Sequence, residues 1–295
     1  MSKAERVAAA GIVIAACLGA ATAFFGSSGG ETIGPISTFG LLVIVAFTVN
    51  IAAFVPSYLK RTDHYYDLIG STTYLTVTAI ALAATGERDT RTVILALLIF
   101  VWAGRLGSFL FRRVKQSDGD RRFDKLKHSS LRFAMAWILQ GLWVTITAGA
   151  ALAAMTSVTK TSFGLLGIVG LAIWIVGFAI EVVADRQKSS FKANPANDGK
   201  FIDVGLWRWS RHPNYFGEIM LWAGIAAIAL PALSGLQYAT LVSPLFVFSL
   251  LTRVSGVPLL EKRSDKVWGG DPDYEQYKAT TPVLVPRPPR RTQGR

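Results

Sequence analysis

The chain has 295 residues, a net charge of +12, 51% hydrophobic residues and a mean hydropathy of +0.39. This hydropathy excludes an ordinary soluble domain, and the basic residues lie between apolar stretches rather than on one folded face, which excludes a nucleic-acid-binding module. The single cysteine, Cys17, excludes an intramolecular disulfide, and three histidines without a cysteine cluster argue against a metal site.

Eight apolar stretches follow one another along the chain. Most reach the roughly 20 residues that a helix needs to cross a hydrocarbon core of about 30 Å. Pro231 to Gly235 separates the last two, which are short and indicate a tight helical hairpin or a partly re-entrant pair. We therefore expect an all-α, polytopic membrane bundle of about eight transmembrane helices, with seven or nine as alternatives. The stretches are 7–26, 36–59, 65–85, 92–111, 131–156, 163–184, 216–232 and 237–252.

The basic residues gather in alternate connections between these stretches. Segments 112–130, 186–214 and 253–295 hold seven, six and nine Lys or Arg, whereas the opposite connections hold only Arg88, Arg91 and Lys160. The positive-inside rule then predicts that both termini are cytoplasmic, in an inner (plasma) membrane. An even number of spans agrees with this orientation.

Three parts are expected along the chain. An extra N-terminal transmembrane helix lies within 1–30, the main membrane domain spans 36–285, and 286–295 forms a disordered basic tail. The first apolar stretch could instead be a cleaved signal, because Ala21-Thr22-Ala23 resembles a cleavage site. Cleavage would leave the other seven spans in the same orientation.

Polar groups converge where the sixth apolar stretch ends. Glu181 and Asp185 are four residues apart and share one face of the predicted helix. Carboxylates at this depth must meet water, a cation or a hydrogen-bonding ligand, because leaving them unpaired in hydrocarbon costs several kcal/mol. The alternative is simple solvation at the membrane interface.

The following helix opens with Ser210-Arg211-His212-Pro213-Asn214-Tyr215. Pro213 fits the first turn of a helix, whose free backbone donors and dipole favour an anion, and Arg211 and His212 add side-chain donors at the same end. This pattern predicts a phosphate or carboxylate site. The alternative is a basic interfacial anchor in which Trp207, Trp209 and Tyr215 form an aromatic belt.

This motif closely resembles the hallmark of a bacterial membrane family related to steroid 5-alpha-reductases (3-oxo-5-alpha-steroid 4-dehydrogenase C-terminal-like). The matching residues run from Asp203 through Gly205-Leu206-Trp207 to Gly217-Glu218, and Arg253 to Lys262 and Asp273-Tyr274-x-x-Tyr277 resemble the family's C-terminal pattern. The resemblance covers roughly residues 36–285 and implies a helical membrane reductase that binds NADPH in a cytoplasm-facing cavity. No strand followed by GxGxxG is found, in agreement with a site other than a Rossmann domain.

The resemblance also implies which residues hold the cofactor. In relatives, these residues lie at the end of the helix matching 163–184, in the following loop and in the C-terminal segment. Transferred by position, they are Glu181, Asp185, Lys192, Asn197, Arg211, His212, Asn214, Tyr215, Glu218, Glu261, Arg263 and Tyr274.

Reduction of a double bond conjugated to a carbonyl needs a hydride at the β carbon and a donor that polarises the oxygen. Steroid reductases resemble one another in using a Gln-Glu pair and a Tyr, and this chain departs from that pattern. It offers Tyr65-Tyr66-Asp67 at the start of the third stretch, with Trp102 and Arg105 in the fourth, and the resemblance places Asp67 in the acidic position. Asp67, Tyr66, Trp102 and Arg105 are thus the catalytic candidates. Tyr65, Tyr66 and Tyr74 are alternative donors or interfacial packing residues, and an Asp67–Arg105 ion pair is the structural alternative.

The expected function is NADPH-dependent reduction of a lipophilic enone, such as a steroid or another lipid, that enters from the bilayer. The alternative is an S-adenosylmethionine-dependent membrane methyltransferase of the isoprenylcysteine or phospholipid type, which shares the Arg-His-Pro-x-Tyr core but usually follows it with a Glu-Glu pair. Only Glu261 stands at that place here. A transporter is a third hypothesis, against which no inverted repeat is found. Membrane lipids are the expected surroundings, and neither a nucleic-acid partner nor an obligate protein partner is inferred.

Overall fold

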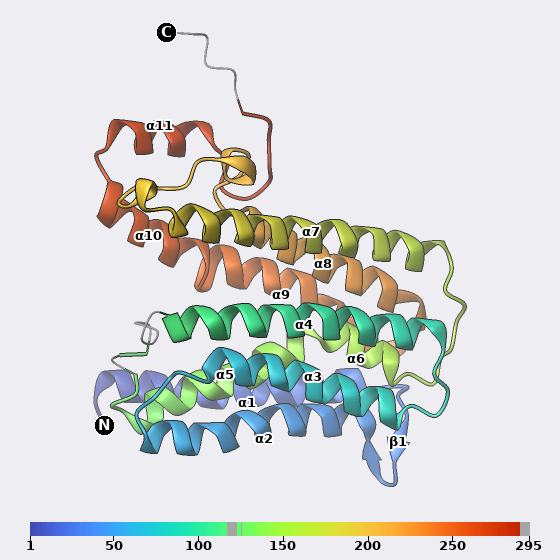
Figure 1. Cartoon of the computed structure of the whole chain (residues 1–295). Helices are drawn as coiled ribbons and strands as arrows, with labels where there is room; N and C mark the ends of the chain where they lie inside the picture. Colours follow the sequence, from blue (N-terminus) through green and yellow to red (C-terminus); the bar gives the residue numbers. More distant parts are fainter. Residues whose placement is uncertain (117–122, 125, 290–295) are drawn as a thin grey trace. The chain divides into compact units, whose positions relative to one another are not determined.

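The computed structural model describes residues 1–116, 123–124 and 126–289 (Figure 1). A short two-stranded hairpin lies between the first two long helices of the chain. Part of the basic connection 112–130 and part of the predicted disordered tail 286–295 lie outside the described residues. The elements are α1 (Lys3–Ser27), β1 (Thr32–Ile33), β2 (Ile36–Ser37), α2 (Thr38–Leu59), α3 (Tyr66–Ala84), α4 (Thr90–Gln116), α5 (Ser130–Thr147), α6 (Gly149–Met155), α7 (Leu165–Ala193), α8 (Pro213–Ala229), α9 (Ser243–Ser249), α10 (Val257–Trp268) and α11 (Pro272–Thr280), with short helices η1 (Pro195–Asn197), η2 (Gly205–Arg208), η3 (Leu230–Ala232), η4 (Gly235–Val242) and η5 (Leu250–Val254).

The polytopic helical bundle expected from the apolar stretches is confirmed. Within the described residues, seven helices are long and apolar enough to cross a membrane, and the bent pair of α5 and α6 would make eight. Each of the first six apolar stretches coincides with a helix or, for 131–156, with this pair. The agreement arises because a helix that satisfies its own backbone is the natural way for 20 apolar residues to lie in hydrocarbon.

The stretch 131–156 is not one straight helix but bends by 55° between α5 and α6. The carbonyl of Thr147, at the end of α5, accepts a hydrogen bond from the buried hydroxyl of Ser243. A side chain that enters the hydrogen-bond ladder in this way satisfies the backbone carbonyl at a kink.

The last apolar stretch, 237–252, also differs from the single short helix expected. A 3-10 helix, η4, leads into α9, and the π-helical turn η5 separates α9 from α10. Pro244 lies at the start of α9, where a missing backbone N–H is tolerated. Together Gly235–Trp268 form a candidate span of 34 residues.

The chain divides into two compact units. Unit 1 consists of Met1–Ile168 and Ile225–Ser243, and unit 2 of Val169–Gly224 and Pro244–Arg295. In unit 1, α3 packs on α4, α5 packs on α1 and α2, and α1 packs on η4. A buried aromatic cluster of Phe123, Phe133 and Trp137 packs against residues of α2, α3 and α5.

In unit 2, α7 and α8 approach one another backbone to backbone. A Cβ atom added at Gly217 would lie 2.5 Å from the carbonyl oxygen of Gly177, and one added at Gly224 would lie 2.6 Å from that of Gly170. The glycines on each helix are seven residues apart, so they repeat every two turns along one face. Small residues allow this close packing inside a membrane, and it fixes the register of α7 against α8.

Candidate functional site

The start of α8 brings three of the predicted site residues into contact. Glu261 of α10 accepts a hydrogen bond from Arg211 Nη1 at 2.8 Å through Oε2, and its Oε1 lies 3.0 Å from His212 Nε2. The helix begins at Pro213, as the sequence predicts. The two donors expected to bind an external anion therefore contact the chain's own carboxylate, which we name the Glu261 bridge (Arg211, His212 and Glu261).

His212 is 5% exposed, and its surroundings favour the neutral imidazole. Burial lowers the pKa of His212, and this effect outweighs the opposite effect of the hydrogen bond to Glu261; the positive charges of Lys188 and Arg211 lower it further. The imidazole ring stacks on Tyr215 with ring centroids 5.5 Å apart. The backbone N–H of His212 donates to Ser210 Oγ at 3.1 Å, which also anchors this residue.

The acidic pair of α7 lies against α8 in the same unit. Glu181 and Asp185 are 3% and 7% exposed. Asn214 Nδ2 donates to Asp185 Oδ1 at 3.3 Å, and the backbone of Glu181 lies beside Gly217, where a Cβ atom would be 2.7 Å from the Glu181 nitrogen. The close α7–α8 packing thus carries both buried carboxylates to the first turns of α8.

The loop 194–212 folds back on the end of α7. Leu206 N–H donates to Gln187 Oε1 at 2.9 Å, and the indole N–H of Trp207 donates to the carbonyl of Ala184 at 3.0 Å. Gly205 has a φ of +59°, and a Cβ there would lie 2.5 Å from the Gln187 side chain, so only glycine fits this turn. Lys188 lies over the Trp207 ring at 4.6 Å.

Two tyrosines of α11 join this helix to the loop and to α10. Tyr277 donates to the carbonyl of Trp207 at 2.7 Å, and Tyr274 donates to Asp265 at 3.0 Å. Burial raises the pKa of Tyr274 to about 12, and the hydrogen bond to Asp265 adds to this; burial also raises the pKa of Tyr277. Both phenols are therefore neutral donors at physiological pH.

The segment 282–287 completes the site. The carbonyl of Pro282 accepts a hydrogen bond from Arg211 N–H at 2.9 Å, and that of Leu284 accepts one from Ser210 Oγ at 2.7 Å. Arg287 N–H donates to the carbonyl of Trp209 at 2.9 Å. This C-terminal strap (residues 282–287) pins the backbone immediately before α8.

The remaining predicted cofactor residues are less closely joined to the Glu261 bridge. Lys192 is exposed near the end of α7, and Arg263 is exposed on α10. Asn197 lies in η1 and donates to the carbonyl of Phe191 at 2.9 Å, which shapes the loop. Glu218 is half-buried in the second turn of α8.

The four predicted catalytic residues lie in unit 1, on α3 and α4. The Tyr66 hydroxyl donates to the carbonyl of Ala136 at 2.9 Å, and its ring packs on Phe123 and Trp137. Trp102 is 3% exposed and meets Tyr74 edge to face at 5.1 Å. Asp67 is half-buried in the first turn of α3, and Arg105 lies over the Phe109 ring at 5.2 Å.

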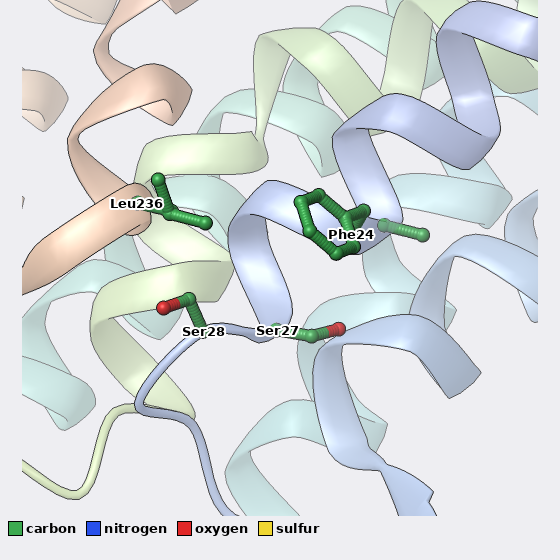
Figure 2. A pocket seen from close by; sticks show the side chains of 5 residues that line it. Phe24, Ser27, Ser28 and Leu236 are labelled. Carbon is green, nitrogen blue, oxygen red and sulfur yellow. The ribbon is translucent and has the colours of Figure 1, made fainter.

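Two pockets of unit 1 lie along α1, away from these side chains. The larger, of about 610 Å³, is lined by Ala23, Phe24, Ser27 and Ser28 of α1 and the following turn and by Leu236 of η4 (Figure 2). The second, of about 330 Å³, lies between α1 and α2 and shares Ala23 with the first. Neither is lined by a predicted site residue.

Sequence reasoning missed several residues that build the site. Gln187 and Lys188 follow Asp185 on α7, and Lys188 is seven residues after Glu181, so helical spacing already places it near the acidic face. Tyr277 belongs to the motif that carries the resemblance. Asp265 offers no comparable local signal, because its partners Tyr274 and Lys278 are on another helix.

Comparison with known proteins identifies relatives. The pattern of the family described as "Protein of unknown function (DUF1295)" matches residues 53–281. The chain is similar to Delta(14)-sterol reductase of Ascobolus immersus (40% identity; 20% of the chain and 17% of the relative) and to 3-oxo-5-alpha-steroid 4-dehydrogenase 1 of Mus musculus (27% identity; 40% of each). It is also similar to the probable O-methyltransferase ustE of Ustilaginoidea virens (32% identity; 33% of the chain and 32% of the relative).

These matches are partial, since the chain spans less than half the length of each of the three relatives. The relatives come from fungi and a mammal, so the bacterial character of the expected family stays a prediction. No solved structure matches the chain.

Proposed function

The chain belongs to the DUF1295 family, and on that premise we propose that it is a membrane-embedded, NADPH-dependent reductase of a carbon–carbon double bond conjugated to a carbonyl in a lipophilic substrate. Support comes from the sterol and steroid relatives and from the multi-pass helical bundle. The substrate class is a steroid or another lipid that reaches the protein from within the bilayer.

The observation that carries this proposal is the buried polar cluster at the start of α8. Arg211, His212 and Glu261 contact one another, and Asp185 and Asn214 lie on the same helix pair. Buried Arg211 Nε and His212 Nδ1 have no hydrogen-bond partner within the described structure. Unsatisfied buried polar atoms are rare, and a ligand is one way to satisfy them, so the cluster fits a polar cofactor.

We assign cofactor binding to the twelve residues nominated from the sequence, with the cluster facing the cytoplasm. The exposed basic side chains of Lys192 and Arg263 would attract the phosphates, and the remaining polar groups would orient the dinucleotide directly or, like Glu261, through the residues that they hold. When bound, the cofactor would supply a hydride to the β carbon of the enone.

Asp67, at the start of α3, is the proposed proton donor. It would donate to the carbonyl oxygen of the substrate and so neutralise the electron density that moves onto that oxygen during reduction. Tyr66, Trp102 and Arg105 would position the substrate and the acid. Tyr66 already donates to Ala136, so its role would be packing and orientation through that bond.

A methyltransferase is the second candidate function, because one relative is named a probable O-methyltransferase. S-adenosylmethionine could occupy the same cluster. The chain, however, has a single carboxylate at Glu261 where the methyltransferases usually carry two, since Lys262 follows it. This difference favours the reductase.

The test is thermal unfolding of the detergent-purified protein with NADPH, NADH or S-adenosylmethionine. A ligand that binds only the folded state stabilises it by about 2.7 kcal/mol at a hundredfold excess over its Kd. We expect selective stabilisation by NADPH, and its loss in Arg211→Ala with little change in yield. Selective stabilisation by S-adenosylmethionine would replace the reductase by the methyltransferase.

A further inference from the structure

In the Glu261 bridge, Arg211 and His212 each have one buried nitrogen atom that makes no hydrogen bond within the described structure. Arg211 Nε, a donor, and His212 Nδ1 are both buried without a hydrogen-bond partner within the described residues. Arg211 Nη1 and His212 Nε2, on the same two side chains, contact Glu261. Which role Nδ1 plays depends on where the imidazole carries its proton.

Glu261 decides the position of that proton. A carboxylate only accepts hydrogen bonds, so its contact with His212 Nε2 at 3.0 Å requires the proton on Nε2. Oε2 of the same carboxylate accepts from Arg211, which holds the carboxylate ionised and in this orientation. In a neutral imidazole Nδ1 is then an acceptor, and the exchangeable proton is fixed on the far side of the ring.

The charges around the ring preserve the neutral form. Glu261 from α10 favours a second proton, whereas burial, Arg211 and Lys188 from α7 oppose it, and the net effect is a lowered pKa for His212. Tyr215 stacks flat on the ring and contributes no charge. His212 therefore cannot donate to a phosphate through Nδ1 near neutral pH.

We propose that Glu261 is a positioning residue that locks His212 in the Nε2–H tautomer, so that His212 binds the ligand through Nδ1, as a neutral acceptor for an N–H donor. Arg211 Nε is a donor on the preceding residue. A ligand that meets both atoms therefore needs a donor for His212 Nδ1 and an acceptor for Arg211 Nε, as a carboxamide or an aminopurine provides on one edge. This inference deepens the proposed function. It rests on that function for one point, namely that the ligand is a dinucleotide.

A matched pair of variants tests the roles of the two ring nitrogens, Nδ1 and Nε2, separately. The amide of His212→Asn reaches about as far as Nδ1, whereas that of His212→Gln reaches about as far as Nε2. We expect His212→Asn, which keeps an acceptor near the position of Nδ1, to lose less NADPH affinity than His212→Gln and to unfold at a lower temperature than wild type. His212→Gln should keep the contact with Glu261 and the unfolding temperature but lose roughly tenfold or more in affinity, as for one buried hydrogen bond.

Glu261→Gln tests whether Glu261 fixes the tautomer of His212, an effect that we call the lock. Arg211 requires an acceptor, so the amide oxygen of the new side chain would face Arg211 and its NH2 group would face His212 Nε2. The imidazole proton would then move to Nδ1, which would become a donor. We expect this variant to fold but to bind NADPH about tenfold more weakly than wild type.

Nitrogen-15 NMR of histidine-labelled protein reads the tautomer without any ligand. The chain has only three histidines, and the spectrum of His212→Asn identifies the His212 signals by their loss. We expect the Nε2–H form in wild type and the Nδ1–H form in Glu261→Gln. NADPH affinity of wild type should also fall as the pH drops and His212 gains its second proton, whereas His212→Asn should lack this step.

The outcomes separate the inference from the function on which it rests. A charged imidazole at pH 7, or the Nδ1–H form in wild type, would overturn the lock even if NADPH binds. Equal loss of affinity in His212→Asn and His212→Gln would overturn the acceptor role while leaving the reductase intact. Failure of wild type to bind NADPH, with the Nε2–H form observed, would overturn the reductase and the dinucleotide ligand but not the lock. Competition by 2′,5′-ADP or by reduced nicotinamide mononucleotide would show which half of the dinucleotide carries the donor and acceptor that bind His212 and Arg211.

Discussion

Arg211 and His212 are neighbours in the sequence but differ in what Glu261 does to them. The carboxylate neutralises the charge of Arg211, and it fixes the proton of His212. Formal charge alone predicts that both residues donate hydrogen bonds to a phosphate. It does not take into account that Glu261 fixes the proton of His212 on Nε2. At the scale of single residues, the site is therefore less cationic than its sequence suggests.

Asp67 is the residue whose role is easiest to test in unit 1. Asp67→Asn should lower enone reduction by at least about a hundredfold, because an amide is a far weaker acid, while NADPH affinity stays within about twofold. The measurement is NADPH oxidation with an enone found by screening, together with a binding titration.

Asp63 provides the matched control, four residues earlier in the chain. It is 5% exposed and forms an ion pair with Lys127 at 3.5 Å. Asp63→Asn should lower the unfolding temperature but retain turnover. A fully active Asp67→Asn protein would exclude Asp67 as the essential proton donor.

The residues of the site could be predicted only in part. Motif resemblance selected Arg211, His212 and Glu261, but their contacts span 49 and 50 residues, and no local pattern states which group meets which. Likewise Tyr66 was selected as a candidate donor, whereas its hydroxyl contacts a carbonyl 70 residues away. Contacts of this kind depend on how helices pack.

At the scale of helices, apolar length predicted most elements and missed the two breaks. At the bend between α5 and α6, the carbonyl of Thr147 accepts a hydrogen bond from the hydroxyl of Ser243, which is 96 residues away. A hydropathy pattern predicts how long an apolar stretch is, but it does not predict which distant side chain forms a hydrogen bond with a backbone carbonyl of the helix.

The glycine contacts of α7 and α8 give a prediction at this scale. Gly217→Ala would place a methyl group 2.5 Å from the carbonyl of Gly177, so the helices must separate. We expect a loss of about 1 to 3 kcal/mol in the free energy of unfolding, as for overpacking elsewhere. NADPH affinity should fall as well, because Glu181 and Asp185 would move away from α8.

Gly104→Ala is the control for this substitution. Gly104 lies within α4, and a Cβ atom there would have no neighbour within 4 Å. Alanine is favoured over glycine in a helix by up to about 1 kcal/mol, so thermal unfolding should occur at the same or a higher temperature. If both alanine variants behaved alike, close packing of α7 on α8 would not be the explanation.

At the scale of the whole molecule, the placement of basic residues predicts the topology. In a Cys17→Ser background, Glu87→Cys should react with a membrane-impermeant maleimide added to intact cells, and Lys200→Cys should react only after lysis. Both positions are exposed in the structure. The reverse labelling pattern would place the α8 cluster on the outer side, where cytoplasmic NADPH could not reach it.

The C-terminal strap also has a consequence for how the protein is made. The backbones of Trp209 and Arg211 and the hydroxyl of Ser210 are hydrogen-bonded to residues 282–287, and Glu261 lies between these two segments in the sequence. A ribosome that has just finished α8 has therefore produced a loop whose partners do not yet exist. The membrane helices can insert one after another, but the cluster at α8 forms only after residues 282–287 have left the ribosome. Ligand binding should thus report that synthesis has passed the C-terminal strap, and a nascent chain halted before residue 261 should be inserted in the membrane and yet unable to bind NADPH.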